Sequence, residues 1–511
     1  MKPKLPCFLL SLMLGSSLVS SSSWASSPGI LPANVPPAKP VVTASSSKQP
    51  ALRGLWVDAF GTGLRSPEEV DDVVASAKKL GVNAIFAQIG KRGDCYCNKA
   101  SVPRAEDPDF VAGFDPLENL IGKAHKEGIQ VHAWMTTTAV RSKQLAAPRN
   151  PKHVWNAHGE DQIGPDNWLI YRQDGTDDAG IDYYLDVANP DAAAYIAEMY
   201  TSVVKNYAVD GIMLDRARYP DNNPTPMQNF WGYSEVSLER FRRESGFKGT
   251  PRAFETTWTA WRREQINNLV RRIYLEVKAI RPEVWVSAAT ITYGPPPKNE
   301  LEFDKTRTFV EVLQDWPLWS RSGWLDLNVM MNYKRSEGQQ KLWYSGWNDF
   351  AATLEGPGRA RQAAGSAMYL NTLEASFEQA KAGTATLNGW VGYSYRSPSL
   401  EGEKGRSSVT ENLGALLSTL EPVGPLGAPA PVRALEGTLR AGKRPATGVV
   451  VELWSGGKKW VSTVSDGGGL YGFVGVPPGP LELRIAGEKT RTLVVETGKV
   501  LTLPTVLLTK R

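Results

Sequence analysis

The sequence predicts a (β/α)8 TIM barrel of the α/β class, followed by a small all-β sandwich domain. Three observations lead to this prediction. The chain has 511 residues, which suggests two or three domains. Between residues 51 and 423, eight short apolar runs alternate with amphipathic stretches, as strand-then-helix units do. Beyond residue 431, only short strand-like runs separated by turns remain.

The barrel elements follow one another along the chain. Ser66 is a suitable N-cap for the first helix, and Gly81 suits its end. The clearest helix has apolar residues at helical spacing from 266 to 280 and ends before Pro282. The predicted strands are 54–60, 83–89, 129–134, 210–215, 284–289, 325–333, 365–370 and 389–395. The predicted helices are 67–80, 117–126, 190–207, 266–280, 308–318, 339–355, 373–382 and 409–420. An open doubly wound sheet is disfavoured because no Gly-rich phosphate turn follows the first strand.

The C-terminal part is expected to be a separate β-sandwich over residues 432–511. Residues 424–431 (GPLGAPAP) predict a Pro/Gly hinge that joins it to the barrel. Turns at 466–468 and 477–479 separate short runs of strand composition. The predicted strands are 435–439, 449–454, 460–464, 471–474, 481–485, 490–495 and 501–508.

The N-terminus has the pattern of a secretory signal. Lys2 and Lys4 precede an apolar stretch over residues 8–19, and small residues at 23 and 25 suit cleavage after Ala25. A membrane anchor is less favoured because the apolar stretch is shorter than the roughly 20 residues that span a bilayer. Residues 1–25 are therefore expected to be removed, leaving no transmembrane anchor and an exported protein of the periplasm, cell envelope or extracellular space. Residues 26–50, rich in Ser, Pro and Ala, predict a flexible linker.

Charge and reactive side chains exclude several classes of protein. The formal net charge is only +5 and no Lys/Arg block exceeds three residues, which argues against a nucleic-acid partner. Cys95 and Cys97 are expected to be packed free thiols, because Cys-x-Cys closes only a small, strained ring. The histidines lack the spacing of a tight zinc cluster, so no metal or cofactor is expected. They are His125, His132, His153 and His158.

Asp215 is the sharpest catalytic candidate. It closes the hydrophobic run 211–215, and Arg216 and Arg218 follow it. Side chains at the carboxyl ends of barrel strands converge on one mouth, where an apolar wall raises the pKa of an Asp and a guanidinium lowers it. An Asp–Arg ion pair that only braces the loop is an equally open interpretation.

Other strand ends provide groups that suit carbohydrate. Aromatic faces stack on sugar rings, and amides and carboxylates hydrogen-bond to hydroxyls. One strand-end residue, His132, points either to the mouth or to the helix layer. The strand-end candidates are Asp58, Gln88, His132, Trp134, Thr290, Asn332, Tyr333, Tyr369, Asn371, Tyr393 and Tyr395.

The second carboxyl group that glycoside hydrolysis usually needs is not obvious from the sequence. Asp326 stands at the start of a strand, which favours pairing at the barrel bottom over catalysis. The remaining candidates are Asp58, Asp94, Glu302, Asp304 and Asp315.

Residues 52 to about 400 resemble the glycosyl-hydrolase-like 10 family of bacterial envelope proteins. The matching runs are RGLWVDAF at 53–60, Gln88, KRGD at 91–94, VHAW at 131–134, DGIML-D at 210–215 with Arg218-Tyr219-Pro220, QDW at 314–316 and MNY at 331–333. The resemblance implies a TIM barrel and glycosidase activity on peptidoglycan glycan strands, especially strands stripped of their peptides. It adds Arg92, Asp94 and Tyr219 to the expected substrate contacts.

The chain departs from the family pattern at two places. Asp94-Cys-Tyr-Cys97 stands where relatives usually carry Asp-Ala-Tyr-Tyr, and Asp215-Arg-Ala-Arg218 stands where many have Asp-Tyr-Ile-Arg. The C-terminal part resembles carboxypeptidase-regulatory-like sandwiches, which usually act as spacers or weak binders.

The leading hypothesis is an exported hydrolase of envelope polysaccharide that needs no cofactor. Asp215 would be its key carboxylate, and Arg218 would tune or position that carboxylate. A barrel that binds glycan without cutting it is the second hypothesis, and a metal-dependent deacetylase is a weaker third.

Overall fold

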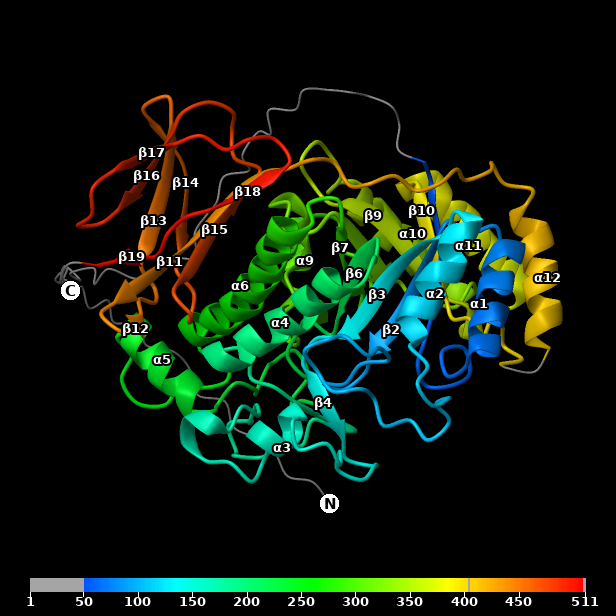
Figure 1. Ribbon diagram of the computed structural model, residues 1–511, viewed down its shortest axis with the longest axis horizontal. Coiled ribbons are helices and arrows are strands. Elements are labelled where there is room, and N and C mark those ends of the chain that lie inside the picture. The colour runs from blue at the N-terminus through cyan, green and yellow to red at the C-terminus, as the bar shows by residue number, and fades with distance from the viewer. Residues whose placement is uncertain (1–49, 403–404, 509–511) are drawn as a thin grey trace, which may run out of the picture. The chain divides into compact units, whose positions relative to one another are not determined.

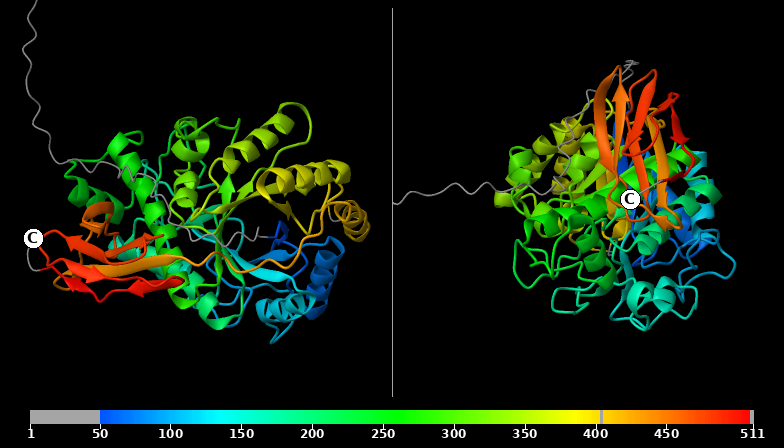
Figure 2. Two further views of the ribbon diagram at one scale, coloured as in Figure 1. Left: turned by 90° about the horizontal axis from the view of Figure 1, so that it is seen from above. Right: turned by 90° about the vertical axis from the view of Figure 1, so that its left-hand side faces the viewer.

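A computed structural model describes residues 50–402 and 405–508, in which eight parallel strands close into a barrel. The predicted (β/α)8 fold is therefore confirmed, and Figures 1 and 2 show helices arranged around the strands. The predicted signal sequence and most of the predicted linker lie outside the described residues. Around the barrel the strand order is β1, β10, β9, β8, β7, β6, β3, β2.

The strands and helices begin and end close to the predicted positions. The barrel strands are β1 (Leu52–Val57), β2 (Ala84–Gly90), β3 (Gln130–Thr136), β6 (Gly211–Asp215), β7 (Trp285–Ile291), β8 (Leu327–Met331), β9 (Arg361–Ala367) and β10 (Gly389–Tyr393). The larger helices are α1 (Pro67–Lys79), α2 (Pro116–Ala124), α4 (Pro190–Asn206), α5 (Glu235–Ser245), α6 (Thr256–Ile280), α10 (Gly338–Ala352), α11 (Leu373–Leu387) and α12 (Arg406–Leu417). The loops carry β4 (Ala139–Ser142), β5 (Asp182–Tyr184), α3 (Val154–His158), α7 (Glu300–Phe303), α8 (Arg307–Val310) and α9 (Trp316–Arg321).

Local sequence signals explain the helix starts. The Ser66 side chain accepts a hydrogen bond from the Glu69 amide and Pro67 opens α1, as a capped helix with N-terminal Pro requires. The Asn189 side chain caps α4 in the same way, on the amides of the second and third residues that follow it. None of the helices within 50–402 and 405–508 is long and apolar enough to cross a membrane.

Two predicted elements are wrong in detail. The helix expected over 308–318 is two short helices, because Leu313 adopts a left-handed conformation (φ 55°) and Asp315 then caps α9 on the Leu318 amide. The strand expected over 365–370 begins at Arg361 and ends at Ala367, and a 3-10 turn occupies the rest. In both places a local backbone turn interrupts an apolar run that reads as continuous.

Large side chains fill the barrel interior where neighbouring strands carry glycine. The Trp56 indole Nε1 lies 3.2 Å from the Met213 sulfur, and Phe86 and Trp134 belong to the same buried cluster. A Cβ on Gly365 would lie 2.6 Å from the Trp56 ring, so the indole needs this glycine. The interior is therefore a packed core below the mouth, as in other barrels of this size.

The predicted hinge over 424–431 packs against the bottom of the barrel instead. The Leu426 side chain is only 4% exposed and belongs to the interior cluster. Asn83 donates to the Gly424 carbonyl at 2.9 Å, and Trp285 donates to the Gly427 carbonyl at 2.9 Å. Proline and glycine make this segment irregular, but its apolar side chain and carbonyl groups find partners on the barrel.

The C-terminal module has two sheets around its own apolar core, as the sandwich prediction requires. One sheet contains β11 (Arg433–Ala441), β12 (Arg444–Pro445), β15 (Leu470–Val474), β18 (Lys499–Thr502) and β19 (Val506–Leu507). The other contains β13 (Val450–Ser455), β14 (Lys458–Val464), β16 (Leu481–Ile485) and β17 (Arg491–Leu493).

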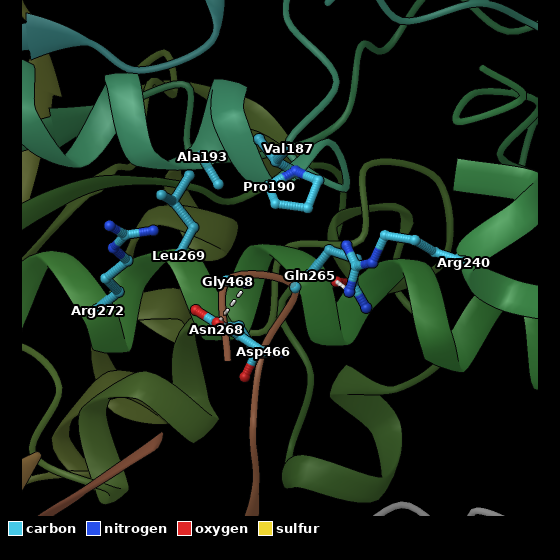
Figure 3. Close-up of a pocket in the computed structure, with 11 residues that line it drawn as sticks. Val187, Pro190, Ala193, Arg240, Gln265, Asn268, Leu269, Arg272, Asp466 and Gly468 are labelled. Atoms are coloured by element: carbon cyan, nitrogen blue, oxygen red, sulfur yellow. Dashed lines mark hydrogen bonds between the residues drawn. The ribbon is translucent and has the colours of Figure 1, made fainter. Parts of the chain in front are cut away.

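The module packs on the outer face of α6. The Arg271 guanidinium of α6 is buried and donates to the Thr463 hydroxyl at 2.6 Å. Figure 3 shows the turn around Asp466 and Gly468 beside α4, α6 and Arg240. A Cβ on Gly467 would lie 2.7 Å from the Arg240 guanidinium, so a larger residue here would require that side chain to shift.

Replacing Leu426 with Ala tests whether the 424–431 segment stabilises the barrel. Removing a buried leucine side chain should lower the free energy of unfolding by about 2–5 kcal/mol, measured by urea denaturation. Leu342→Ala, at a side chain 71% exposed, is the matched control and should change it by less than about 0.5 kcal/mol. Equal stability of the two variants would mean that the segment is a free hinge.

Candidate active site

Asp215 lies at the mouth of the barrel with its backbone held and its carboxylate free. It is the last residue of β6, and its carbonyl accepts a hydrogen bond from the Thr137 amide at 2.7 Å. The residue is 8% exposed. Among the described residues, none donates a hydrogen bond to the carboxylate. The side chain is thus firmly placed and available to a ligand.

Arg216 supplies the positive charge beside this carboxylate. Its backbone is left-handed (φ 53°), and its guanidinium NH1 donates to Asp182 at 2.6 Å and to the Tyr184 hydroxyl at 3.1 Å. Burial alone would lower the pKa of Arg216, but Tyr184, Asp215 and Asp182 outweigh it and raise that pKa. Arg216 therefore stays charged next to Asp215.

Arg218, the residue expected to tune Asp215, has a different partner. Its NH2 lies 3.7 Å from the Asp221 carboxylate, which also accepts a hydrogen bond from the Tyr293 hydroxyl at 2.6 Å. Burial would raise the pKa of Asp221, but Arg218 and Tyr293 outweigh it and lower that pKa. Arg216, by contrast, has a charge interaction with Asp215.

Aromatic rings form a wall of the same mouth. The Tyr333 and Tyr393 rings stack with centroids 5.4 Å apart, and the Tyr369 ring packs edge-on against both. Trp134 packs edge-on against Tyr393 at 6.3 Å. Tyr369 is 38% exposed, so part of the wall faces solvent. Such rings offer flat apolar faces for stacking.

Asp58 is the second carboxylate of this mouth. Burial is the main cause that raises the pKa values of Tyr333 and Tyr393, and the charges of Asp58 and Asp215 both add to it. Both carboxylates therefore act on the same pair of rings. Unlike Asp215, Asp58 already has hydrogen-bond donors from the protein. It accepts hydrogen bonds from Arg396 at 3.0 Å, from Ser394 at 2.9 Å and from the Phe60 amide at 3.1 Å.

The structure also assigns places to Gln88, Arg92 and Asp94. The Gln88 side-chain carbonyl accepts a hydrogen bond from the Ala59 amide at 3.0 Å, which holds the loop after β1 in place. Arg92 donates through Nε to Asp182 at 2.7 Å. Asp94 accepts from the Lys91 and Arg92 amides and so shapes the loop after β2. Gln88 and Asp94 thus support the mouth loops, whereas Arg92 extends the charged network of Arg216.

Four expected substrate contacts point away from the mouth. His132 has no exposed surface, packs on the Phe86 ring at 4.6 Å inside the barrel, and burial lowers its pKa to about 4. Asn332 donates to the Tyr344 carbonyl and the Asn348 side chain of α10. Tyr219 is buried beside Arg262. Tyr395 packs under Arg406 of α12. These four residues support the fold. His132 lies within β3 and faces the barrel interior, whereas the other three lie beyond their strand ends, where the chain changes direction.

The other acidic candidates are also structural. Asp326 accepts from Lys278 at 2.7 Å and from the Val286 amide at 2.8 Å, consistent with its expected role at the barrel bottom. Glu302 accepts from the Lys298 amide in a surface turn. Asp315 caps α9, and burial raises its pKa to about 6. Burial likewise raises the pKa of Asp304.

Cys95 and Cys97 form a disulfide, so the expectation of free thiols is wrong. Their Cα atoms lie 5.0 Å apart, within the usual range for a disulfide. The bend is held by hydrogen bonds of Cys95 to Pro103 and Ala105. The Tyr96 hydroxyl between them donates to Asp107 at 2.8 Å. The spacing alone suggested strain, but the folded loop brings the two cysteines together.

Several residues of the mouth were not expected from the sequence. Asp182 belongs to β5, which pairs with β4 across a long connection and precedes α4, and nothing in its neighbourhood marks it as part of a site. Phe60 and Arg396 follow β1 and β10, so their position after strand ends is a signal that finds them. Within 50–402 and 405–508, no group of three or more His, Cys, Asp or Glu residues is arranged to hold a metal ion.

Comparisons with known proteins agree with this geometry. The profile of the family described as Glycosyl hydrolase-like 10 matches residues 51–369. The chain is 23% identical to Glycosyl hydrolase DigH of Escherichia coli O6:H1 over 373 residues, which cover 65% of this chain and 77% of DigH. It is 22% identical to Glycosyl hydrolase YngK of Bacillus subtilis over 343 residues, which cover 62% of this chain and 57% of YngK.

The barrel also resembles solved structures. The catalytic domain of β-amylase from Paenibacillus polymyxa superposes with a TM-score of 0.50 at 13% identity, covering 73% of this chain and 99% of that domain. A similarity at this identity shows the fold alone.

Asp315→Asn tests whether Asp315 is a buried structural acid. Its folded-state pKa of about 6 exceeds the usual value for Asp, so ionisation destabilises the folded protein above that pH. Asn keeps the N-cap acceptor, and urea denaturation at pH 8 should show a free energy of unfolding about 1–3 kcal/mol higher. The gain should shrink as the pH falls below 6 and should vanish below about 3, where the wild-type carboxyl is protonated in both states. A variant less stable than wild type at both pH values would contradict this assignment.

Proposed function

Because the chain belongs to the glycosyl hydrolase-like 10 family, we propose that it is an exported glycosidase that cleaves O-glycosidic bonds of cell-envelope polysaccharide. We propose peptidoglycan glycan strands as the substrate. The observation that carries the proposal is the Asp215 carboxylate, placed at the barrel mouth beside an aromatic wall without a hydrogen-bond donor among the described residues. The relatives DigH and YngK are named glycosyl hydrolases, which supports this class of reaction.

The chemistry follows from the groups at the mouth. Cleavage of a glycosidic bond develops positive charge on the sugar ring, which a carboxylate stabilises or attacks. Asp215 has this role in our proposal. Arg216 holds a positive charge beside it, while Tyr333, Tyr369 and Tyr393 offer faces on which sugar rings stack. Asp58 is the second carboxylate that acts on the same rings.

Two observations support an extracytoplasmic location. The first 25 residues have the pattern of a secretory signal, as described above. The Cys95–Cys97 disulfide is the second, because disulfides persist mainly in oxidising compartments. We propose that the protein works in the periplasm, the envelope or the extracellular space.

We propose that the C-terminal module is a spacer of the carboxypeptidase-regulatory-like type. Arg271 ties it to α6, a barrel helix, through the Thr463 hydroxyl. Asp215 lies in the barrel, so the module needs no part in the chemistry.

A barrel that binds glycan without cutting it is the second candidate. It is favoured by the three protein hydrogen bonds that Asp58 accepts, which leave this carboxylate with less free acceptor capacity than Asp215. The cleavage experiment with Asp215→Asn, described next, separates the two candidates.

Asp215→Asn should abolish cleavage while leaving the fold intact. Purified protein incubated with peptide-free murein glycan is expected to release new reducing ends, and the variant should lose this activity by about 100-fold or more. Asp349→Asn, at an exposed position of α10, is the matched control and should retain activity.

The outcomes of this experiment are distinct. Wild-type protein that sediments with the glycan but releases no reducing ends would support the binding barrel. Full activity in Asp215→Asn would show that another carboxylate carries the reaction.

A further inference from the structure

One buried carboxylate joins two arginines at the mouth of the barrel. Asp182 of β5 accepts from Arg92 Nε at 2.7 Å on one oxygen and from Arg216 NH1 at 2.6 Å on the other. Its own side chain is 2% exposed. We call Arg92 and Arg216, held in this way, the arginine pair. The pair brings together Arg92, from the loop after β2, and Arg216, the residue that follows Asp215.

The arginine pair keeps donors that the protein does not use. Arg92 offers only Nε to Asp182, and Arg216 offers only NH1 to Asp182 and Tyr184. The remaining N–H groups of both guanidinium groups have no hydrogen-bond partner within the described part of the chain. The two side chains are 15% and 27% exposed, so both remain partly accessible to solvent.

An exposed aromatic ring stands next to the arginine pair. Phe60 is 47% exposed, and the Arg92 guanidinium carbon lies 5.6 Å from its centroid. Lys91 Nζ lies 5.5 Å from the same centroid. A flat apolar face beside unused guanidinium donors suits a sugar ring that carries an anionic substituent.

The charge of the cluster selects the kind of anion. Two guanidinium groups against the Asp182 carboxylate leave one positive charge, which a single carboxylate balances and a doubly charged phosphate monoester exceeds. The planar fork of Arg matches a carboxylate geometrically. Asp215, which interacts with Arg216, and Lys91, which lies beside the same Phe60 ring, add one charge of each sign and leave this sum unchanged.

We propose that the arginine pair is a subsite for a carboxylate group carried by the glycan, and that the substrate is therefore an acidic polysaccharide. This inference rests on the proposed glycosidase function and makes it more specific. Asp182 has a positioning role, because it fixes the spacing of two side chains that come from different loops.

The direct test changes the glycan and leaves the protein intact. Peptide-free murein glycan carries a lactyl carboxylate on each muramic acid, and amidation with methylamine removes that charge. Wild-type protein should cleave the amidated glycan with a kcat/KM at least about 10-fold lower, mainly through KM, since a hydrogen bond to a charged group is lost. Equal kcat/KM on both glycans would overturn the proposal while leaving the glycosidase function standing.

A variant of the arginine pair locates the effect. Arg92→Gln should raise KM for the acidic glycan about 10-fold and change KM for the amidated glycan little. Arg149→Gln, which removes a positive charge from a side chain 86% exposed, is the matched control and should leave both values unchanged. An equal loss on both glycans would show that Arg92 only supports the fold, and this outcome would overturn the subsite.

Binding separates the failure of the subsite from the failure of the enzyme. If the wild-type protein cleaves neither glycan, the proposed function fails, and calorimetry with the same two glycans still tests the subsite. Tighter binding of the acidic glycan by wild-type protein, lost in Arg92→Gln, supports the proposal. Equal binding of both glycans overturns it.

Discussion

Closure of the parallel sheet is the constraint on which the candidate site depends. β1 pairs with β2 on one side and with β10 on the other, so the last strand returns to the first. Because all eight strands run in the same direction, their carboxyl ends share one rim. Asp58, Asp215 and Tyr333, which are far apart in the chain, act on one another only because the sheet closes.

Charge at this rim is neutralised in pairs, and Asp215 stands out against that background. Asp58 has Arg396, Asp182 has the arginine pair, and Asp221 has Arg218. A buried charge costs several kcal/mol unless a partner compensates it, which explains the pairing. A carboxylate that retains free acceptor capacity in such a place is typical of a functional site.

The sequence predicted the elements of the barrel well and the direction of side chains at strand ends poorly. Apolar runs and N-caps such as Ser66 are local signals, so the eight barrel strands and most of the major helices lie near their predicted ranges, whereas β4, β5 and α5 were not predicted. The alternation of side chains in a strand ends with the strand. Asn332 and Tyr395 lie just beyond that point, where the chain turns toward α10 and α12. Asp182 carries no local signal, because only the folding of a long loop brings it to Arg216.

The sequence by itself determined the order of strands and helices, the barrel fold and the position of Asp215 at the end of β6, because apolar periodicity, caps and a strand-terminal acid are properties of neighbouring residues. The tertiary structure alone decided which distant groups meet: Arg396 at Asp58, Arg92 and Arg216 at Asp182, and Leu426 against the barrel bottom. These contacts depend on distances between loops, and only the closed sheet sets those distances.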